Sequence, residues 1–474
     1  MAMQRDYEKC RILNYQYTQE QTEQVEFFLS QLFRKNRKLF VVIDDDPTGG
    51  QTVHDVNVYT NWNYHVMLEA FKTETVMFYI MTNSRSMTRA ETIKVHEEIM
   101  DSLNRASKLT NRKYEVISRG DSTLRGHYPT EPDIIRKGLG KTVQKEIIIP
   151  FFQEGNRYTL KDIHCLIEDR MLIPVGESEF AKDKTFGFKN SNLKRWIEEK
   201  TSGAYPAALV ESISLEMLRN LDFEGIEQIL TDKKSKKVIV NVTCYMDLKV
   251  FAVCYFLALQ KGFSFVARTA ASWPKVIGGF PEVPYIQGKD IVDGNSSTGG
   301  LIIIGSHVSK TTEQFETLKN SGLDINFIEF NQHEATDIRR LEMEVQRVSQ
   351  LTNQSLAGGL TTVVYTRRKR LDFNTESKEE ELIVTNRIAD AITTIAAGIE
   401  KKPRYLIVKG GITSSDVAVK AFCATKATIW GQVAPGIPVW KLGEGSKYPG
   451  MIYVIFPGNV GTKNTLYEIV GSLQ

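Results

Sequence analysis

The stretch "VVIDDDPTGGQTVHD", residues 41–55, places three aspartates directly after an apolar run and follows them with a Thr-Gly-Gly turn. A buried strand that ends in such a cluster holds its carboxylates at the rim of a sheet, which is where open α/β folds bind their ligands. The stretch therefore predicts an α/β sheet with a candidate site at the carboxyl end of one of its strands.

Short apolar runs recur along the chain and alternate with helical patterns. In the first half, β-rich runs lie at 39–43, 76–81, 114–118, 146–152 and 238–242, and residues 89–109 place apolar side chains near one face of a helix. In the second half, runs lie at 301–306, 325–330, 361–366, 405–411 and 451–461, with helical patterns around 310–320, 337–351 and 380–399. This alternation predicts an α/β fold in which mostly parallel sheets are flanked by helices.

The length of 474 residues favours two domains. The stretch "GKDIVDGNSSTGG" (288–300) has the composition of an exposed connector. We therefore expect an N-terminal helical extension at 1–37, a first α/β domain at 38–290 with a flap at about 153–202, and a second α/β domain at 300–474.

Composition excludes several classes of partner. The net charge of +3 is nearly balanced, so neither nucleic acid nor an anionic membrane surface is predicted, and small ligands are favoured. The five cysteines form no CxxC pair, which speaks against a disulfide framework or a structural zinc site. Val250–Leu259 is too short to cross a membrane and is expected to be a buried helix. The N-terminus lacks an uninterrupted apolar segment of a secretory signal, so a cytoplasmic location is expected.

Asp44, Asp46 and Thr48 spell DxDxT, the spacing of haloacid-dehalogenase-type phosphotransferases. In such an enzyme Asp44 would attack phosphorus and Asp46 would handle a proton. A late acidic pair would also be needed to hold magnesium. The best candidate stretch for that pair, "RGDSTLRGHY" (119–128), has Arg125 where the second acid would stand. A phosphatase using Asp44 is kept as an alternative, and so is an acidic turn without chemistry.

Arginines and hydroxyl groups follow two further predicted strands. "SRGDSTLRGHYPTE" (118–131) contains Arg119 and Arg125, and "TNSRS" (82–86) contains Arg85. A guanidinium group binds a carboxylate in a bidentate manner, so such a cluster suits a small carboxylic acid. Three polar clusters that end three neighbouring strands predict one site at the rim of the first sheet.

Glycine turns mark the second half. "VKGGITSSD" (408–416) and "FPGNVGTKN" (456–464) each run from a strand through a glycine turn towards a helix, and "IIIGSHVSK" (302–310) ends a further strand. Glycine lets backbone N–H groups approach an anion closely, and a helix N-terminus favours negative charge. Together the turns predict a cradle for nucleotide phosphates.

The ordered series of motifs resembles the four-carbon acid-sugar kinase family from about residue 38 to the end. The motifs are "DDDPTGGQTVHDV", "TNSR", "RGDSTLRGHYPTE", "FVARTAAS", "IIIGSHVS", "VKGGITSSDVA", "GQVAPGIPV" and "FPGNVG". The resemblance implies a two-domain enzyme that binds a sugar acid in the N-terminal domain and ATP in the C-terminal domain, with the active site in the cleft between them. The implied reaction transfers phosphate to the terminal (C4) hydroxyl of a tetronate, such as threonate or erythronate, or of a 3-oxo-tetronate.

The resemblance and the residue patterns together give the expected site residues. Asp46 or Asp45 would orient or deprotonate the hydroxyl; on a strand Asp45 would face away from Asp44 and Asp46, unless the turn has begun. The expected substrate-binding residues are Asp46, Thr48, Arg85, Arg119, Gly120, Asp121, Ser122 and Arg125. The expected ATP-binding residues are Ser306, Gly410, Gly411, Ile412, Thr413, Gly458, Asn459 and Gly461.

The resemblance also implies that Mg²⁺ accompanies the ATP. The expected partners are thus small molecules, and a homo-oligomer is compatible with the sequence. The chain departs from the family pattern at Pro47 and Gly50, at Ile412, where many members carry an acid, and at Phe456-Pro457, where many carry a lysine. A sensor that binds a sugar acid without catalysis is a further alternative, which the two glycine turns disfavour.

Overall fold

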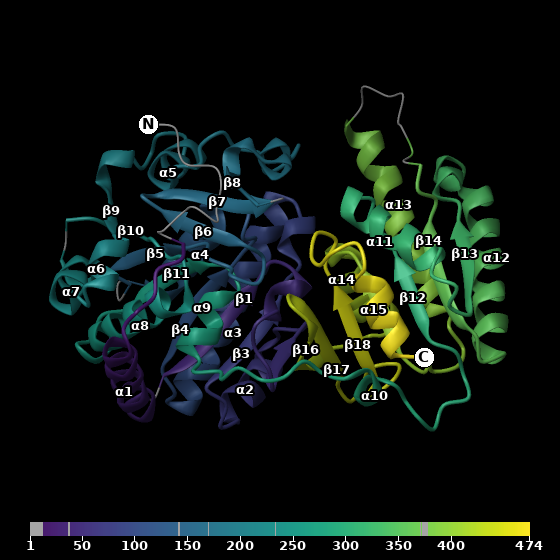
Figure 1. The fold of residues 1–474 in the computed structure, drawn as a ribbon, viewed down its shortest axis with the longest axis horizontal. Helices are drawn as coiled ribbons and strands as arrows, with labels where there is room; N and C mark the ends of the chain where they lie inside the picture. Colours follow the sequence, from purple (N-terminus) through teal and green to yellow (C-terminus); the bar gives the residue numbers. More distant parts are fainter. Residues whose placement is uncertain are drawn as a thin grey trace. The chain divides into compact units, whose positions relative to one another are not determined.

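The structure, a computed structural model, describes residues 13–36, 38–140, 143–168, 170–232, 234–369, 371 and 378–474. The chain divides into two compact units (Figure 1). The first is made of the residues up to Gly49 and of Asn61–Pro281, and the second of Gly50–Thr60 and Glu282–Gln474. Residues 50–60 fall within the stretch expected to form the first domain, but they belong to the second unit.

The first unit contains a parallel sheet with the strand order β3-β1-β4-β11-β5-β10-β9. The strands are β1 Leu39–Asp44, β3 Met77–Met81, β4 Tyr114–Arg119, β5 Lys145–Ile149, β9 Val210–Ile213, β10 Lys237–Val240 and β11 Phe265–Thr269. Every residue of β1, β3, β5, β10 and β11 is buried, as expected for parallel strands covered on both faces. The strands predicted in this half of the sequence are confirmed, and β9 and β11 are additional strands of this sheet.

Two groups of helices pack in the first unit. One group is α2 Tyr64–Lys72, α3 Arg89–Thr110 and α4 Thr130–Leu139. The other is α1 Gln19–Lys35, α6 Leu215–Arg219, α7 Phe223–Thr231, α8 Tyr245–Gln260 and α9 Ser272–Ile277. α3 begins at a capping box, in which Thr88 Oγ1 accepts from Glu91 N and the Glu91 carboxylate accepts from Thr88 N.

The most apolar run of the sequence, Val250–Leu259, lies in α8 and is confirmed as a buried helix, since only Leu257 of it is not fully buried. No helix among the described residues is long and apolar enough to span a membrane.

A smaller antiparallel sheet occupies part of the stretch expected to be a flap. It consists of β6 Arg157–Leu160, β7 Ile163–Glu168 and β8 Met171–Pro174, and α5 Leu193–Lys200 follows it. Leu166 of β7 and Trp196 of α5 belong to the same buried cluster as Ile148 of β5 and Ile239 of β10. The stretch therefore packs as a layer of the first unit.

The second unit contains a mixed sheet. β13, β14, β12, β15 and β18 lie parallel in this order, and β17, β16 and β2 continue the sheet in antiparallel pairs. The strands are β2 Val56–Tyr59, β12 Leu301–Ile304, β13 Ile325–Phe330, β14 Thr361–Thr366, β15 Leu406–Lys409, β16 Lys426–Ala434, β17 Ile437–Leu442 and β18 Ile452–Phe456. The runs predicted in this half are confirmed as strands, although those at 405–411 and 451–461 extend into turns.

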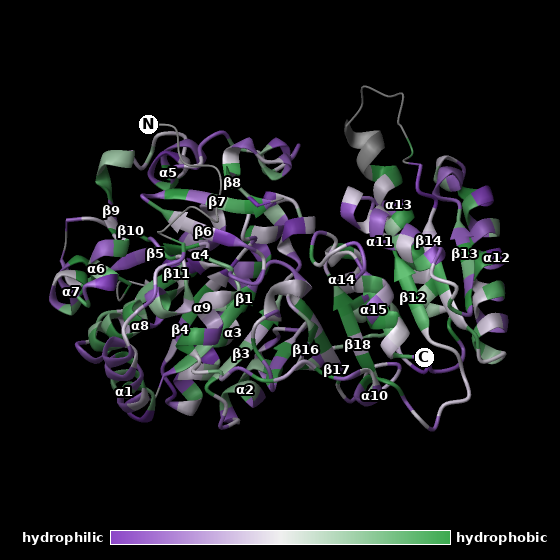
Figure 2. Ribbon diagram, in the orientation of Figure 1, coloured by the Kyte–Doolittle hydropathy of each residue, from purple (hydrophilic) through white to green (hydrophobic). Residues whose placement is uncertain are grey.

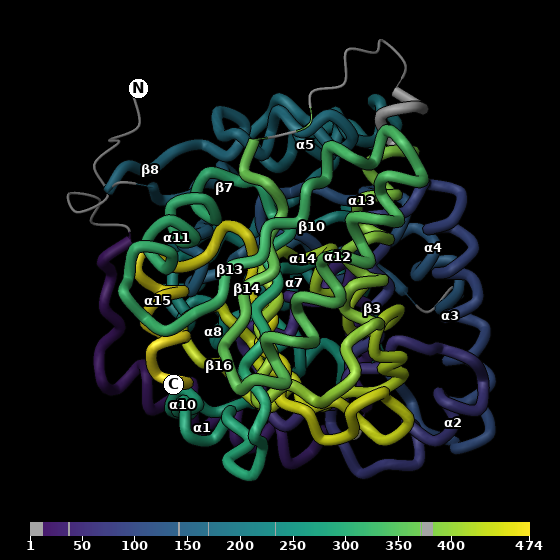
Figure 3. Tube along the Cα trace, turned by 90° about the vertical axis from the view of Figure 1, so that its right-hand side faces the viewer, coloured from purple at the N-terminus to yellow at the C-terminus, as the bar shows by residue number. Residues whose placement is uncertain are grey.

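Helices cover both faces of the parallel part of this sheet (Figure 3). α11 Ser309–Lys319 packs against α15 Thr465–Ser472 on one face, and α12 Ile338–Ala357 packs against α13 Lys378–Ala397 on the other. Figure 2 shows hydrophobic residues along the central strands and hydrophilic ones on α12. The second unit is therefore also an α/β layer structure.

Candidate functional site

The strand order of the first unit creates a topological switch point. The chain runs from β1 to its neighbour β3 and then crosses to β4, on the other side of β1. Ligands of open α/β sheets bind at the carboxyl ends of the strands that flank such a point. Here these ends carry Asp44 and Arg119, which are direct neighbours in the register of β1 and β4.

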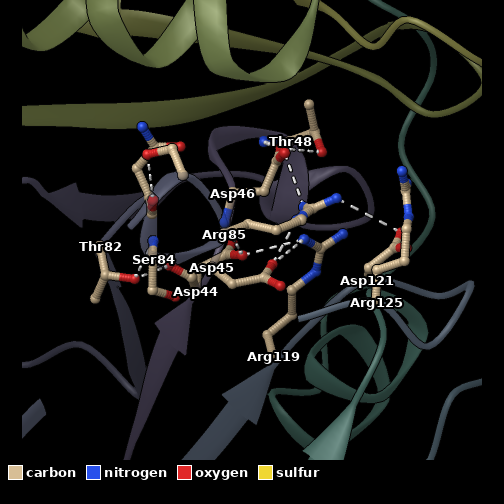
Figure 4. Close-up of polar contacts among 12 residues, drawn as sticks. Asp44, Asp45, Asp46, Thr48, Thr82, Ser84, Arg85, Arg119, Asp121 and Arg125 are labelled. Carbon is tan, nitrogen blue, oxygen red and sulfur yellow. Dashed lines mark hydrogen bonds and ion pairs between the residues drawn. The ribbon is translucent and has the colours of Figure 1, made fainter. Parts of the chain in front are cut away.

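Arg85 joins the aspartates and the loop after β4 into one network (Figure 4). It lies on the 3₁₀ turn Ser84–Ser86, which follows β3. Its Nη2 is 2.8 Å from Asp46 Oδ2 and 3.3 Å from Asp45 Oδ1. Its Nη1 is 3.7 Å from Asp121 Oδ1. Burial acts to lower the pKa of Arg85, but the surrounding carboxylates raise it above its usual value, so the guanidinium stays charged.

Asp44 lies beneath the turn and is 2% exposed. Its Oδ1 is 3.1 Å from Arg119 Nη1, and a Cβ built on Gly49 would lie 1.6 Å from its Oδ2. Burial raises the pKa of Asp44 to about 7, because the attraction of Arg119 offsets the burial only in part. The backbone at Gly49 thus closes over this carboxylate, which disfavours the alternative in which Asp44 attacks phosphorus.

Asp46 is the most exposed of the three carboxylates, at 7%. Its Oδ1 accepts hydrogen bonds from Thr48 N at 2.8 Å and Thr48 Oγ1 at 2.5 Å, within the 3₁₀ turn Pro47–Gly50. Burial acts to raise its pKa, but Arg85, Arg119 and the bonds from Thr48 together hold the pKa below its usual value. Asp46 is therefore an ionised hydrogen-bond acceptor at neutral pH.

Asp45 does not face away from its neighbours as regular strand alternation would require. β1 ends at Asp44, and the turn starts at once. Asp45 Oδ1 lies 3.3 Å from Arg85 Nη2 and 3.4 Å from Arg119 Nη1. The early turn therefore lets Asp45 pair with both guanidinium groups, whereas Asp44 pairs with Arg119 and Asp46 with Arg85.

The loop after β4 contributes the remaining predicted substrate-binding residues. Arg125 Nε lies 2.7 Å from Asp121 Oδ2. Burial opposes the ionisation of Asp121, but Arg125 and Arg85 together hold its pKa well below the usual value. Ser122 is 8% exposed, and its carbonyl oxygen is 2.7 Å from His164 Nε2 of β7. The structure thus brings these residues and the aspartates into one charged cluster.

Sequence reasoning missed a buried ion pair beside this cluster. Arg268 of β11 has Nη1 2.7 Å from Glu131 Oε2 of α4 and donates to Ser118 Oγ at 3.1 Å. Ser84 Oγ donates to Glu131 Oε1 at 2.6 Å. A Cβ on Gly120 would lie 2.1 Å from Arg268 Nη2, so glycine is needed there. An arginine inside the apolar run "FVARTAAS" was the available signal, because a buried guanidinium needs a carboxylate partner.

Some polar atoms of the cluster have no hydrogen-bond partner among the described residues. They are Asp45 Oδ2, Arg85 Nε and Arg119 Nε, and each is buried. Buried polar groups in folded proteins are normally satisfied, so such atoms at a switch point are candidates for contact with a ligand or ordered water. One acceptor and two donors are thus available to a ligand or to ordered water.

The second unit has a switch point of the same kind. From β12 the chain runs to the edge strand β13 and returns to β14 beside β12. It then crosses to β15 on the other side of β12. The carboxyl ends of β12 and β15 lead into Gly305-Ser306 and Gly410-Gly411. The predicted phosphate cradle therefore lies where an open α/β sheet binds its ligand.

Three turns meet closely at this edge. A Cβ on Gly458, after β18, would lie 2.9 Å from Ser306 Oγ, and one on Gly305 would lie 2.4 Å from Thr413 Oγ1. Gly410 has a φ of +122°, which strains any residue with a side chain. Thr311 Oγ1 lies 3.0 Å from the Gly458 carbonyl oxygen and 3.2 Å from Ser306 Oγ. This bare backbone suits close approach by an anion.

The other residues expected to bind ATP make fewer close contacts with the three turns. Gly411 begins the short helix α14 Gly411–Asp416, and Ile412 beside it is 50% exposed. Asn459 and Gly461 lie in the loop after β18, where Gly461 packs against Thr465 at the start of α15. Among the described residues no group of three His, Cys, Asp or Glu side chains could hold a metal ion.

Comparison with protein families identifies the two halves. Residues 40–276 match the model of a sugar-binding N-terminal domain, and residues 301–466 match that of a nucleotide-binding C-terminal domain. The chain belongs to the four-carbon acid sugar kinase family. The aspartate–arginine cluster lies in the sugar-binding domain of this family, and the glycine turns lie in its nucleotide-binding domain. A comparison with curated proteins gives no match.

Solved structures agree with this fold. A Haemophilus influenzae protein of the family DUF1537 is similar with a TM-score of 0.57 and 15% identity, over 92% of this chain and 100% of that one. A Salmonella typhimurium LT2 protein that carries a provisional name as a tRNA synthase is similar with a TM-score of 0.62 and 14% identity, over 92% of this chain and 99% of that one. At such identities the likeness supports the fold alone.

The sugar-binding domain should show a pH dependence of stability that comes from Asp44. Its pKa is about 7 in the folded protein and about 3.9 in an unfolded chain, so the folded state holds a proton that the unfolded state releases. The resulting stabilisation is full below about pH 4 and is lost as the pH rises towards 7. Asp44→Asn should therefore flatten the fall of the unfolding free energy across this range, by up to about 1.4 kcal/mol per pH unit. Urea unfolding at a series of pH values measures this, and parallel curves for the two proteins would contradict it.

Proposed function

We propose that the protein is an ATP-dependent kinase that phosphorylates the terminal (C4) hydroxyl of a four-carbon sugar acid, a tetronate or 3-oxo-tetronate. The observation that carries the proposal is the placement of two different sites at two switch points. The sugar-binding domain has carboxylates and arginines at its own switch point, and the nucleotide-binding domain has glycine turns at the other. A kinase needs such a pair of sites, one for the acceptor and one for the phosphoryl donor.

The charges of the first site suit an acid that also carries hydroxyl groups. Arg85 and Arg119 keep their Nε donors unpaired among the described residues and would bind the carboxylate of the substrate. Asp45 Oδ2 is an unpaired acceptor and would receive a substrate hydroxyl. Thr48, Ser122 and the backbone at Gly120 would complete the contacts, and Arg125 would hold Asp121 in place, as its 2.7 Å ion pair suggests.

Asp46 is assigned to the attacking hydroxyl. It is the most exposed aspartate of the cluster, and its carboxylate is ionised because its pKa is lowered. A carboxylate with a low pKa is a weak base, so its main task would be to accept a hydrogen bond and aim the hydroxyl oxygen. Phosphoryl transfer depends chiefly on such positioning and on neutralisation of charge.

The nucleotide-binding domain would hold ATP through Ser306, Gly410, Gly411, Thr413 and Gly458, with Ile412, Asn459 and Gly461 nearby. The fit rests on positions where a Cβ would fill the space, as at Gly458, and on the positive φ of Gly410. Magnesium would enter on the phosphates of the nucleotide and neutralise their charge there.

The test is an ADP-release assay with Mg²⁺-ATP and a panel of four-carbon sugar acids. We expect ADP release with at least one tetronate or 3-oxo-tetronate, and a product that ³¹P NMR identifies as the 4-phosphate. A matched five-carbon acid should react more slowly. ADP release that stays at the background level with every four-carbon acid would contradict the proposed function.

A further inference from the structure

Lys409, the last residue of β15, is a buried lysine in the nucleotide-binding domain. It is 0% exposed, its Nζ donates to the Pro457 carbonyl oxygen at 3.0 Å, and it lies 3.7 Å from the centroid of the Phe456 ring. Among the described residues no carboxylate lies within 4.0 Å of its Nζ. An ammonium group buried without an anion is costly, so it either loses its proton or gains an anionic partner.

Two further cationic residues lie on the connections that follow β14 and β12. Arg368 follows β14, and Lys310 is the second residue of α11, which follows β12. Burial, together with the charges of Lys310 and Arg368, lowers the pKa of Lys409 well below its usual value. Because β14, β12 and β15 are adjacent strands, all three cations lie at the carboxyl edge of the same part of the sheet.

Arg368 also has open donors. Its Nη2 donates to Thr312 Oγ1 at 2.7 Å, while its buried Nε and Nη1 have no partner among the described residues. Burial lowers the pKa of Arg368, although the charge of Glu316 on α11 acts to raise it. Arg368 and Glu316 form no ion pair among the described residues. Positive charge therefore dominates at this edge.

The remaining charged groups nearby are already engaged. Asp416, the acid of α14, has Oδ1 3.1 Å from Lys420 Nζ. His307, after β12, has Nε2 3.2 Å from the Arg367 carbonyl oxygen. The neighbours of Lys409 on β18 are uncharged. Among the described residues no carboxylate is paired with Lys409, so a bound anion would supply the missing partner.

Lys409 lies beside the glycine turns that follow β15 and β18. Its hydrogen-bond acceptor, Pro457, directly precedes Gly458, whose Cβ would lie 2.9 Å from Ser306 Oγ. Lys409 itself directly precedes Gly410, whose Cβ would lie 3.3 Å from Ser306 Cβ. The ammonium group therefore lies where the turns after β12, β15 and β18 meet.

We propose that Lys409, Lys310 and Arg368 form the subsite that binds the polyphosphate of a nucleoside di- or triphosphate, with Lys409 as its buried centre. The subsite rests on the proposed function, since it specifies which side chains hold the nucleotide. The several negative charges of a polyphosphate match a cluster of three cations, and a bound phosphate favours the charged form of Lys409.

The test is calorimetric titration of the full-length protein at pH 8 in EDTA, with ADP and with adenosine as probes. Lys409→Met should weaken ADP binding by about 10–100-fold, the effect of losing a charged hydrogen bond, and leave adenosine binding unchanged. Lys310→Met and Arg368→Met should each weaken ADP binding by about 3–10-fold. Lys441→Met, on the exposed side of β17, is the matched control and should bind ADP as the native protein does.

Proton uptake separates this role from a structural one. Native protein should take up a fraction of a proton per ADP, measured from the binding enthalpy in buffers of different ionisation enthalpy. The uptake should vanish in Lys409→Met and persist in Lys310→Met. Lys409→Met should fold, because methionine replaces an unpaired buried ammonium with an apolar chain of similar length.

Two results would overturn the subsite. They are native-like ADP affinity in Lys409→Met, or an equal loss of ADP and adenosine affinity. In both cases native protein still binds ADP, so the proposed function would stand. Native protein that binds no ADP, either in EDTA or with Mg²⁺, would overturn both proposals.

Discussion

Asp46→Asn should lower kcat/KM for the sugar acid by about 10²–10⁴-fold, the range for loss of a group that handles a proton or aims the reacting hydroxyl. The native carboxylate accepts from Thr48 through Oδ1 and pairs with Arg85 through Oδ2 at 2.8 Å. An asparagine amide has nearly the same shape, but it carries no negative charge and presents N–H donors on one side. It can therefore neither neutralise Arg85 nor accept a hydrogen bond from the substrate hydroxyl through its NH₂ side.

The effect should fall on turnover and leave nucleotide binding intact. ATP affinity, measured by calorimetry, should match that of the native protein, because the variant lies in the sugar-binding domain. Asp133→Asn is the matched control: Asp133 is an exposed carboxylate on α4 that pairs with Arg136, and its loss should leave the kinetics unchanged. An Asp46→Asn protein that folds and keeps the native kcat/KM would contradict the assigned role.

The parallel core could be predicted from the sequence because its strands are buried on both faces. β1 and β12 are continuous apolar runs, and such runs stand out locally. β2 could not be predicted in this way. It has only four residues, and its partner β16 lies more than 360 residues further along the chain, with Lys426 paired to Tyr59. Such pairing depends on the tertiary fold and leaves no local signal.

The same distinction applies to the candidate site. Asp46, Arg85 and Arg119 lie within about four residues after the ends of predicted strands, so their meeting at one edge followed from the geometry of a parallel sheet. Arg268 and Glu131 are separated by 137 residues, and one lies inside a strand while the other lies on a helix. Nothing local to either residue specified its partner, although the sequence could show that a buried arginine needs one.

This buried pair should be the most sensitive point for stability. Arg268 Nη1 lies 2.7 Å from Glu131 Oε2, and the two side chains are 8% and 2% exposed. Arg268→Met would leave the Glu131 carboxylate buried and uncompensated, which typically costs about 3–5 kcal/mol of unfolding free energy. Glu131→Gln should lower the unfolding free energy by a similar amount, because it leaves the Arg268 guanidinium buried without a carboxylate partner. Urea unfolding of the purified variants measures both.

The double variant and the pH dependence decide whether charge is the cause. Arg268→Met with Glu131→Gln should be destabilised by less than the sum of the single changes, because it removes both charges. The exposed pair provides the control, since Arg136→Met should cost at most about 1 kcal/mol.

In the native protein burial acts to raise the pKa of Glu131, but Arg268 and the neighbouring groups keep it below its usual value. Without Arg268 burial prevails and Glu131 takes up a proton at low pH, so the deficit of Arg268→Met should shrink as the pH falls and grow as it rises. A deficit that is small, or constant from pH 5 to pH 8, would contradict the uncompensated charge as its origin.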